Sequence, residues 1–354
     1  MTAEPVLVVG VGMITSVGLS APETSASVRA GIMRFEEATL HDHVYQPFTL
    51  AEVPEYGLPD SPDDFGRLEA SSREDRMLRL TECALGECLN LLPSRAASPG
   101  LIVALPETPT TRPVDEAALL EDLAQAVGGR VDLRRSNASP RGRAGGLAAI
   151  ARAGDLIRAG QADLVVAGGI DTYRDSWVLA RLDAERRVKS EVNLDGFIPG
   201  EGAAFLLLAD RRAAGALGLA PMAAVSRVAE AFETGHLYSD EPYSGAGLAA
   251  TLAQLFQSGA ASAPIQEVYS SMNGESFWAK EWGVAFLRNR AAFHAAHRMH
   301  HPADCYGDIG AACGPLMVGL AAVGIRDGYR RSPALVYGSS DHGARAALIV
   351  SAAE

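Results

Sequence analysis

The chain has 354 residues, of which 48% are hydrophobic and 21% are charged, a composition typical of folded globular proteins and not of disordered ones. Its formal net charge of −12 argues against a nucleic-acid-binding protein, because such proteins present a basic face to the phosphates. The length exceeds that of one ordinary core and suits two fused halves or one large α/β unit.

The patterning of apolar residues predicts strands that alternate with helices. In chain order the expected elements are a strand at 6–9, a helix at 73–92, a strand at 101–105, a helix at 145–160, strands at 162–169, 203–209 and 221–228, a helix at 245–257, a strand at 267–271, helices at 281–299 and 310–323, and strands at 334–338 and 346–351. Such alternation indicates parallel strands covered by helices on both faces. The order strand, helix, strand recurs in residues 1–219 and 220–354, which we interpret as two halves of one compact unit.

The beginning of the chain and its cysteines bear on the compartment. The start, MTAEPVLVVGVG, has no basic region before its apolar run, and no stretch approaches the roughly 18 apolar residues of a membrane helix. The four cysteines, Cys83, Cys88, Cys305 and Cys313, form no CxxC pair. We therefore expect a cytoplasmic protein with free thiols and no membrane association.

Five phrases, in order along the chain, resemble the β-ketoacyl-acyl-carrier-protein synthases. They lie at residues 6–18 (VLVVGVGMITSVG), 146–172 (GLAAIARAGDLIRAGQADLVVAGGIDT), 195–218 (DGFIPGEGAAFLLLADRRAAGALG), 306–323 (YGDIGAACGPLMVGLAAV) and 336–350 (VYGSSDHGARAALIV). The resemblance implies an α/β, thiolase-like fold of five layers, αβαβα, with two pseudo-repeated halves. It also implies a homodimer, or a heterodimer with an active ketosynthase, and no cofactor.

Condensation in this family needs a cysteine that carries the acyl chain and two histidines that support decarboxylation and stabilise the enolate. The family's nucleophile phrase, ACATGL or similar, aligns on Gly142–Leu147 and places Arg143 at the cysteine position. The two histidine positions fall on Asn273 and Asp308. Arginine is always cationic and does not act as a nucleophile here. The resemblance therefore implies that the chain keeps the fold and has lost condensing activity.

Two further family positions are also changed. The lysine that precedes the second histidine corresponds to Ala303, and the glycine-rich GFGG segment reads Ser339-Ser340-Asp341-His342-Gly343, which puts His342 near the old site. By contrast, the scaffold motif of the family is intact. Its residues here are Asp195, Gly196, Gly200, Glu201 and Gly202.

The altered site allows three interpretations if these loops still converge. A cation at a helix N-terminus is electrostatically unfavourable, so we expect an Arg143–Asp308 salt bridge that fills the old pocket. Alternatively, Arg143 is free and holds an anion such as a carboxylate. The third interpretation is a new acid/base pair of Asp308 and His342.

Two clusters of side chains outside these motifs have a functional and a plain interpretation. His294, His297, His300 and His301 have helical spacing compatible with a metal face, but a polar helix end explains them better, and no metal site is expected. The loop arginines Arg130, Arg134, Arg135 and Arg141 would suit contact with an acidic acyl carrier protein. In so acidic a chain, a solvated loop is the favoured interpretation.

Three functions remain open at this stage. The first is a non-catalytic subunit of fatty-acid or polyketide-type metabolism, similar in kind to a chain-length factor that pairs with an active synthase. Chain-length factors typically carry glutamine at the cysteine position, whereas this chain carries Arg143. The second is an accessory scaffold that binds other proteins outside lipid synthesis. The third is an acyl-transfer or hydrolytic enzyme with a rebuilt site.

Overall fold

A computed structural model describes residues 5–60, 73–108 and 110–353. The strands are β1 (Val6–Thr15), β2 (Glu36–His41), β3 (Pro47–Leu50), β4 (Gly100–Ala104), β5 (Asn137–Ser139), β6 (Leu164–Thr172), β7 (Glu201–Ala209), β8 (Ala223–Val225), β9 (Ala229–Phe232), β10 (Ile265–Ser270), β11 (Phe293–His300), β12 (Ala334–Ser339) and β13 (Ala344–Ser351). The α-helices are α1 (Ala21–Ala30), α2 (Arg73–Leu89), α3 (Glu116–Ala126), α4 (Gly142–Arg158), α5 (Ser176–Ala184), α6 (Arg211–Leu217), α7 (Ala246–Gln257), α8 (Ser276–Asn289), α9 (Ala303–Tyr306) and α10 (Cys313–Arg326).

The main sheet consists of two series of strands with the same pattern of pairing. In the first series, β1 pairs antiparallel with β7, β7 antiparallel with β6, and β4 and β5 continue in parallel. In the second series, β8 pairs antiparallel with β13, β13 antiparallel with β12, and β10 and β11 continue in parallel. Antiparallel pairing of β1 with β8 joins the two series. The chain order of the strands is also the same in both.

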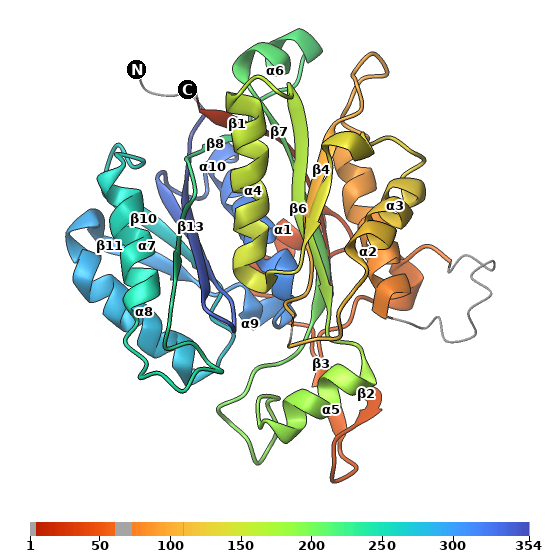
Figure 1. Ribbon diagram of the computed structural model, residues 1–354, viewed down its shortest axis with the longest axis vertical. Helices are drawn as coiled ribbons and strands as arrows, with labels where there is room; N and C mark the ends of the chain where they lie inside the picture. The colour runs from red at the N-terminus through yellow and green to blue at the C-terminus, as the bar shows by residue number, and fades with distance from the viewer. Residues whose placement is uncertain (1–4, 61–72, 109, 354) are drawn as a thin grey trace.

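The helices make five layers with the two series of strands, as the resemblance implies (Figure 1). Helix α4 packs against β4 and β6 of the first series and against β12 and β13 of the second, and α10 contacts α4, β7 and β12. These two helices therefore form the middle layer. Helices α2 and α3 cover the outer face of the first series, whereas α7 and α8 lie outside the second (Figure 1).

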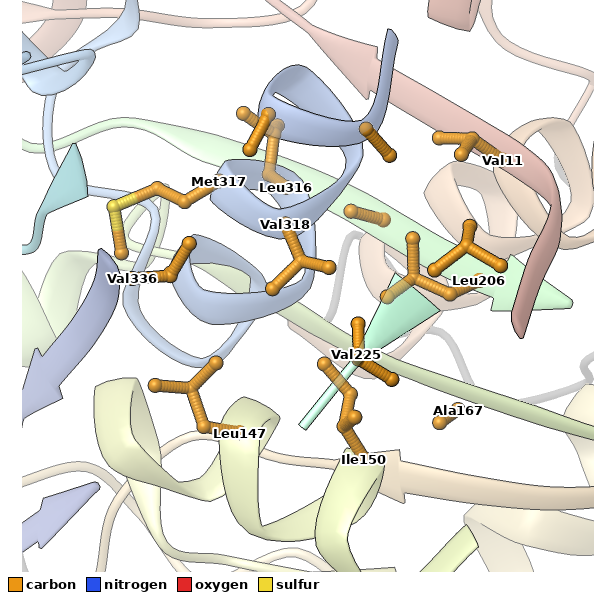
Figure 2. Close-up of a cluster of buried hydrophobic side chains, with 14 of the residues drawn as sticks. Val11, Leu147, Ile150, Ala167, Leu206, Val225, Leu316, Met317, Val318 and Val336 are labelled. Carbon is orange, nitrogen blue, oxygen red and sulfur yellow. The ribbon is translucent and has the colours of Figure 1, made fainter. Parts of the chain in front are cut away.

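The middle layer is held together by apolar packing. Figure 2 shows Leu147 and Ile150 of α4 on one side and Leu316, Met317 and Val318 of α10 on the other, with side chains of the surrounding strands between them. Each of these side chains is at most 2% exposed. Burial of a side chain of this size stabilises the fold by about 1.5–3 kcal/mol. This packing therefore holds α4 and α10 against each other and so positions their first residues.

Gly146 shows how closely α4 and α10 approach each other. A Cβ atom at this position would lie 2.2 Å from Cδ of Pro315 and 2.8 Å from the carbonyl oxygen of Ala311. Only glycine fits there, because any side chain would force the helices apart. The family-like pair Gly146–Leu147 is therefore a packing element as well as a sequence marker.

One expected helix is wrong in its second half. The helix expected at residues 281–299 ends as α8 at Asn289, and Phe293–His300 is strand β11 at the edge of the sheet, parallel to β10. Alanine and arginine in FHAAHRMH favour a helix locally, but hydrogen bonding to β10 overrides that propensity. The other expected elements are present, with ends that shift by a few residues. Helices α1, α3, α5, α6 and α9 and strands β2, β3, β5 and β9 were not expected.

No helix within the described ranges is long and apolar enough to cross a membrane. The boundary that we predict between the halves, at residues 219 and 220, falls in the loop between α6 and β8.

Candidate functional site

Arg143 lies in the first turn of α4 and is buried, with 3% of its surface exposed. Its Nε and Nη2 atoms donate to Oδ2 of Asp308 at 2.9 and 2.5 Å, and Nη1 donates to Oδ1 of Asp341 at 2.7 Å. The indole ring of Trp278 lies 5.2 Å from the guanidinium carbon. The expected Arg143–Asp308 salt bridge is confirmed, and Asp341 is a second partner that the sequence did not suggest.

These groups belong to a closed ring of six hydrogen-bonded side chains, which we call the central ring: Arg143, Asp308, Asn273, Glu275, Arg187 and Asp341. Asn273 Nδ2 donates to Asp308 Oδ2 at 2.7 Å and to Glu275 Oε2 at 3.1 Å. Arg187 forms two bonds to Glu275, of 2.7 and 2.8 Å, and reaches Asp341 Oδ2 at 2.7 Å. Every charge of the ring thus has a partner inside the protein.

The charges of the central ring are divided between the two halves of the fold. Arg143 and Arg187 come from the first half, from α4 and from the loop after α5. The carboxylates come from the second half, from the loops that follow β10 (Glu275) and β12 (Asp341) and from the segment before α10 (Asp308). The ring therefore links the halves by ion pairs that are buried on both sides.

Burial and charge act in opposite directions on the pKa values of these groups. Burial raises the pKa of Asp341, but the charges and hydrogen bonds of Arg187 and Arg143 outweigh it and hold that pKa well below its ordinary value. Burial lowers the pKa of Arg143, and the charges of Asp308 and Asp341 more than compensate, so its pKa is raised well above the ordinary value. Arg143 and Asp341 therefore stay ionised and paired at neutral pH.

Glu107 flanks the central ring from the loop after β4. Its carboxylate oxygens accept the backbone N–H groups of Asp341 and His342 at 2.8 and 3.1 Å. Burial, together with the nearby charge of Asp341, raises the pKa of Glu107 to about 7. Glu107 thus fixes the loop that carries Asp341 and is the group here that titrates near neutral pH.

The space beside Arg143 is nearly full. The cavity lined by Arg143, Asp341, Glu107 and Tyr173 has a volume of about 10 Å³, which is about the minimum for one water molecule. An acyl chain does not fit in this volume. The interpretation of Arg143 as a free cation that holds an external carboxylate is therefore not supported by the geometry.

His342 and Asp308 do not form the acid/base pair considered above. Nε2 of His342 lies 3.2 Å from the Thr110 hydroxyl, and its ring stacks on Tyr238 with 4.7 Å between centroids. Asp308 is occupied by Arg143 and Asn273. Ala303 lies on α9, partly exposed and outside the central ring.

The intact scaffold motif positions Asp308. The backbone N–H of Asp308 donates to the carbonyl of Ile198, and the N–H of Gly200 donates to the carbonyl of Asp308, both at 2.8 Å. A Cβ atom at Gly200 would lie 2.3 Å from the carbonyl oxygen of Tyr306. Only glycine at this position therefore allows the two segments to approach so closely.

The other residues of the motif anchor its two ends. Glu201 accepts from Arg76 and from the Thr172 hydroxyl in the interior, and Asp195 accepts from the backbone N–H of Ser276 at the start of α8. Gly196 and Gly202 are also close contacts: a Cβ atom would lie 2.6 Å from the nitrogen of Lys189 and 2.7 Å from the carbonyl oxygen of Ile14, respectively.

The cysteines offer no replacement nucleophile. Cys313 begins α10 but is buried, and burial with the nearby charge of Asp308 raises the pKa of its thiol to about 12. Burial likewise raises the pKa of Cys88. Since the thiolate is the nucleophilic form, these thiols are inert at neutral pH.

The histidine run does not form a metal site. Because β11 is a strand, His294, His297 and His300 do not share a helical face. His300 instead bonds to Glu267 at 2.6 Å, and His301 to the Ser270 hydroxyl at 2.8 Å. Within the described ranges, no group of three or more His, Cys, Asp and Glu side chains is arranged to hold a metal ion.

The arginine-rich loop before α4 has local partners. Arg134 and Arg135 face Asp132, Arg130 donates to Asn90, and Arg141 pairs with Glu230. These contacts agree with a solvated loop and are compatible with a weak acidic partner.

Sequence reasoning missed Arg187, Glu275, Asp341 and Glu107. One signal was available: Asp341 stands within the altered glycine-rich segment, and a carboxylate in a segment expected near a buried cation is a candidate partner. Arg187 and Glu275 carry no such marker in the sequence.

Comparison with known proteins identifies the fold. Residues 142–214 match the family model described as the N-terminal domain of β-ketoacyl synthases. Over this segment the chain is similar to the β-ketoacyl synthases. No curated protein matches the chain in sequence.

Solved structures share its fold at low identity. The oxazolomycin ketosynthase domain OzmH KS7 of Streptomyces albus JA3453 is 14% identical with a TM-score of 0.79, covering 99% of this chain and 75% of that one. The ishigamide ketosynthase/chain length factor is 18% identical with a TM-score of 0.77, covering all of both chains. The type II polyketide ketosynthase AntDE, in complex with its acyl-carrier protein AntF, is 14% identical with a TM-score of 0.77, covering 99% of this chain and all of that one.

Proposed function

We propose that this chain is a ketosynthase-like, non-catalytic subunit that pairs with a condensing ketosynthase, as a chain-length factor does. One observation carries the proposal: Arg143, at the position that the resemblance assigns to the acyl-bearing cysteine, is buried and paired with Asp308 and Asp341. A guanidinium offers no lone pair for acyl transfer. The likeness to a ketosynthase/chain length factor over the full length of both chains supports the dimeric role.

The central ring also supports the loss of condensation at the two histidine positions. Asn273 is hydrogen-bonded to Asp308 and Glu275, and Asp308 accepts from Asn273, Arg143 and the backbone N–H of Gly310. Neither residue lines the cavity beside Arg143, whose volume of about 10 Å³ leaves no room for an enolate. A rebuilt acyl-transfer enzyme at this location would need both a nucleophile and space.

The test uses the purified chain with acyl- and malonyl-loaded acyl carrier protein and an active ketosynthase as positive control. We expect no acyl adduct by intact mass spectrometry and no β-ketoacyl product. The chain is then co-expressed with a condensing ketosynthase from the same source. We expect a heterodimer by native mass spectrometry and a change in product length. An acyl adduct or a product formed by the chain alone contradicts the proposed loss of condensation.

A second function is favoured by the small size of the cavity beside Arg143. Since an acyl chain does not fit there, a scaffold that uses the fold to bind proteins outside lipid synthesis is the alternative. A stable homodimer that forms no complex with the ketosynthase and leaves its products unchanged would favour the scaffold and contradict the subunit role.

A further inference from the structure

Two adjoining cavities lie along α1, at the C-terminal end of α10, and share no lining residue with the cavity beside Arg143. Their volumes are about 350 and 270 Å³, and the larger falls within the range of small-molecule sites, about 300–1,000 Å³. Ser25, Arg29 and Tyr329 line both cavities and so mark their junction. We call the two cavities together the α1 groove.

The larger cavity of the α1 groove is mainly apolar. Its apolar lining comes from β1, α1, the end of α2 and α10, and includes Val11, Ala26, Leu91, Met222 and Val323. The half-buried acid Glu87 accepts the backbone N–H groups of Met13 and Ala21 with its carboxylate oxygens. This cavity therefore suits an apolar group and has no free acceptor aimed at a cation.

The junction is positively charged. The guanidinium carbons of Arg29 and Arg330 lie 4.3 and 5.5 Å from the centroid of the Tyr329 ring. In the part of the chain that the structure describes, neither arginine forms an ion pair with a carboxylate. Arg326 also lines the groove, but it is paired with Asp327 at 2.7 Å. Two cations on one ring without a carboxylate partner create a field that attracts an anion.

Two polar atoms at the groove have no hydrogen-bond partner. Ser25, which is 4% exposed, has an unpartnered hydroxyl, and the Nε atom of Arg330 is buried without an acceptor. Buried polar groups normally have partners, so an acceptor from outside the chain would complete both. Ser25, Arg29 and Arg330 all line the smaller cavity of the α1 groove, so one oxygen-bearing group bound there would have donors from all three residues beside it.

We propose that the α1 groove binds a small carboxylate with an apolar tail. The carboxylate lies at the junction, between Arg29, Arg330 and the Ser25 hydroxyl, and the tail occupies the larger cavity beside Met222 and Val323. Charge complementarity and the apolar lining select the ligand. A neutral analogue would lack the charge interaction with the arginines, and a free inorganic anion would lack the apolar contacts in the larger cavity. This site is separate from the central ring and does not depend on the proposed function.

Titration calorimetry with the whole chain tests the site, using decanoate as the probe and decanol and inorganic phosphate for comparison. We expect saturable binding of decanoate at one site and binding of decanol and phosphate at least about tenfold weaker, since decanol cannot accept charge-assisted hydrogen bonds and phosphate has no apolar tail. Equal binding of decanol, or no saturable binding of decanoate, overturns the proposal. Phosphate binding as tightly as decanoate also overturns it.

Variants locate the binding. Arg29→Gln, on the exposed face of α1, should weaken decanoate about tenfold, and Ala26→Trp should abolish binding by filling the larger cavity. Arg152→Gln removes an exposed charge on α4 and serves as the matched control, with unchanged affinity. Thermal unfolding of each variant checks that the fold is intact. Unchanged affinity in both Arg29→Gln and Ala26→Trp places the ligand elsewhere and refutes the assignment.

Discussion

The central ring and the α1 groove are two arginine environments in one chain, and they differ in where the partners of the arginines come from. Arg143 and Arg187 are buried, and Asp308, Glu275 and Asp341 neutralise them inside the fold. Arg29 and Arg330 lie at a partly open groove and have no carboxylate partner among the described residues.

The difference follows from the cost of removing a charge from water. A buried cation without a partner costs several kcal/mol, so the fold must supply the partner itself. A cation at a groove keeps its hydration and can exchange it for a ligand. The central ring is therefore a structural element that joins the two halves, and the groove is the place to look for binding.

The largest effect should come from breaking the central ring. Asp341→Ala leaves Arg143 and Arg187 short of a buried partner, and we expect a loss of about 3–5 kcal/mol in the free energy of unfolding, measured in urea. Asp327→Ala, which removes the surface partner of Arg326, is the matched control and should cost less than about 1 kcal/mol. Similar losses in the two variants would mean that the buried ion pairs of the central ring stabilise the fold no more than a surface ion pair does.

The second effect tests the packing beneath the ring. Gly146→Ala inserts a methyl group 2.2 Å from Cδ of Pro315 and should destabilise the fold by about 1–3 kcal/mol. Gly86→Ala, in α2, meets no atom within 4 Å and should be neutral or stabilise the helix by up to about 1 kcal/mol. The unfolding midpoint should fall in Gly146→Ala and stay unchanged or rise in Gly86→Ala. Equal midpoints would mean that α4 and α10 can separate without cost.

The third effect depends on pH. Because the pKa of Glu107 is raised from 4.5 to about 7 in the folded state, the folded chain binds more protons than the unfolded chain between these values. The contribution of Glu107 to the free energy of unfolding therefore falls as pH rises from about 4.5 to 7. Glu107→Gln should remove about 1–3 kcal/mol of that fall. Unfolding free energies of both proteins from pH 4.5 to 8 measure this, and parallel profiles would contradict it.

The smallest effect is expected at the groove. Arg29→Gln should change the free energy of unfolding by less than about 0.5 kcal/mol, because it removes no buried partner. The same urea measurement checks this. A loss of more than about 2 kcal/mol would show that Arg29 is structural and that the groove resembles the central ring.

The motifs allowed much of the fold to be predicted, and the site only in part. The phrases around Gly146 and Asp195–Gly202 mark places where two segments approach too closely for any residue but glycine, and these glycines helped to predict the fold. The Arg143–Asp308 pair followed from one electrostatic argument about a cation at a helix N-terminus. Arg187 and Glu275 could not be found this way, because they are 88 residues apart in the sequence and only the fold brings them together.

The sequence by itself determined the α/β class, the order of most strands and helices, and the presence of arginine, asparagine and aspartate at the positions that the resemblance assigns to the family's catalytic residues. These features depend on residue type and on short-range periodicity, both of which can be read from neighbouring residues in the sequence. The tertiary structure alone decided that FHAAHRMH is an edge strand, that six side chains close into a ring, and that Arg29 and Arg330 share one tyrosine. Those outcomes depend on contacts between segments far apart in the chain, which local periodicity does not predict.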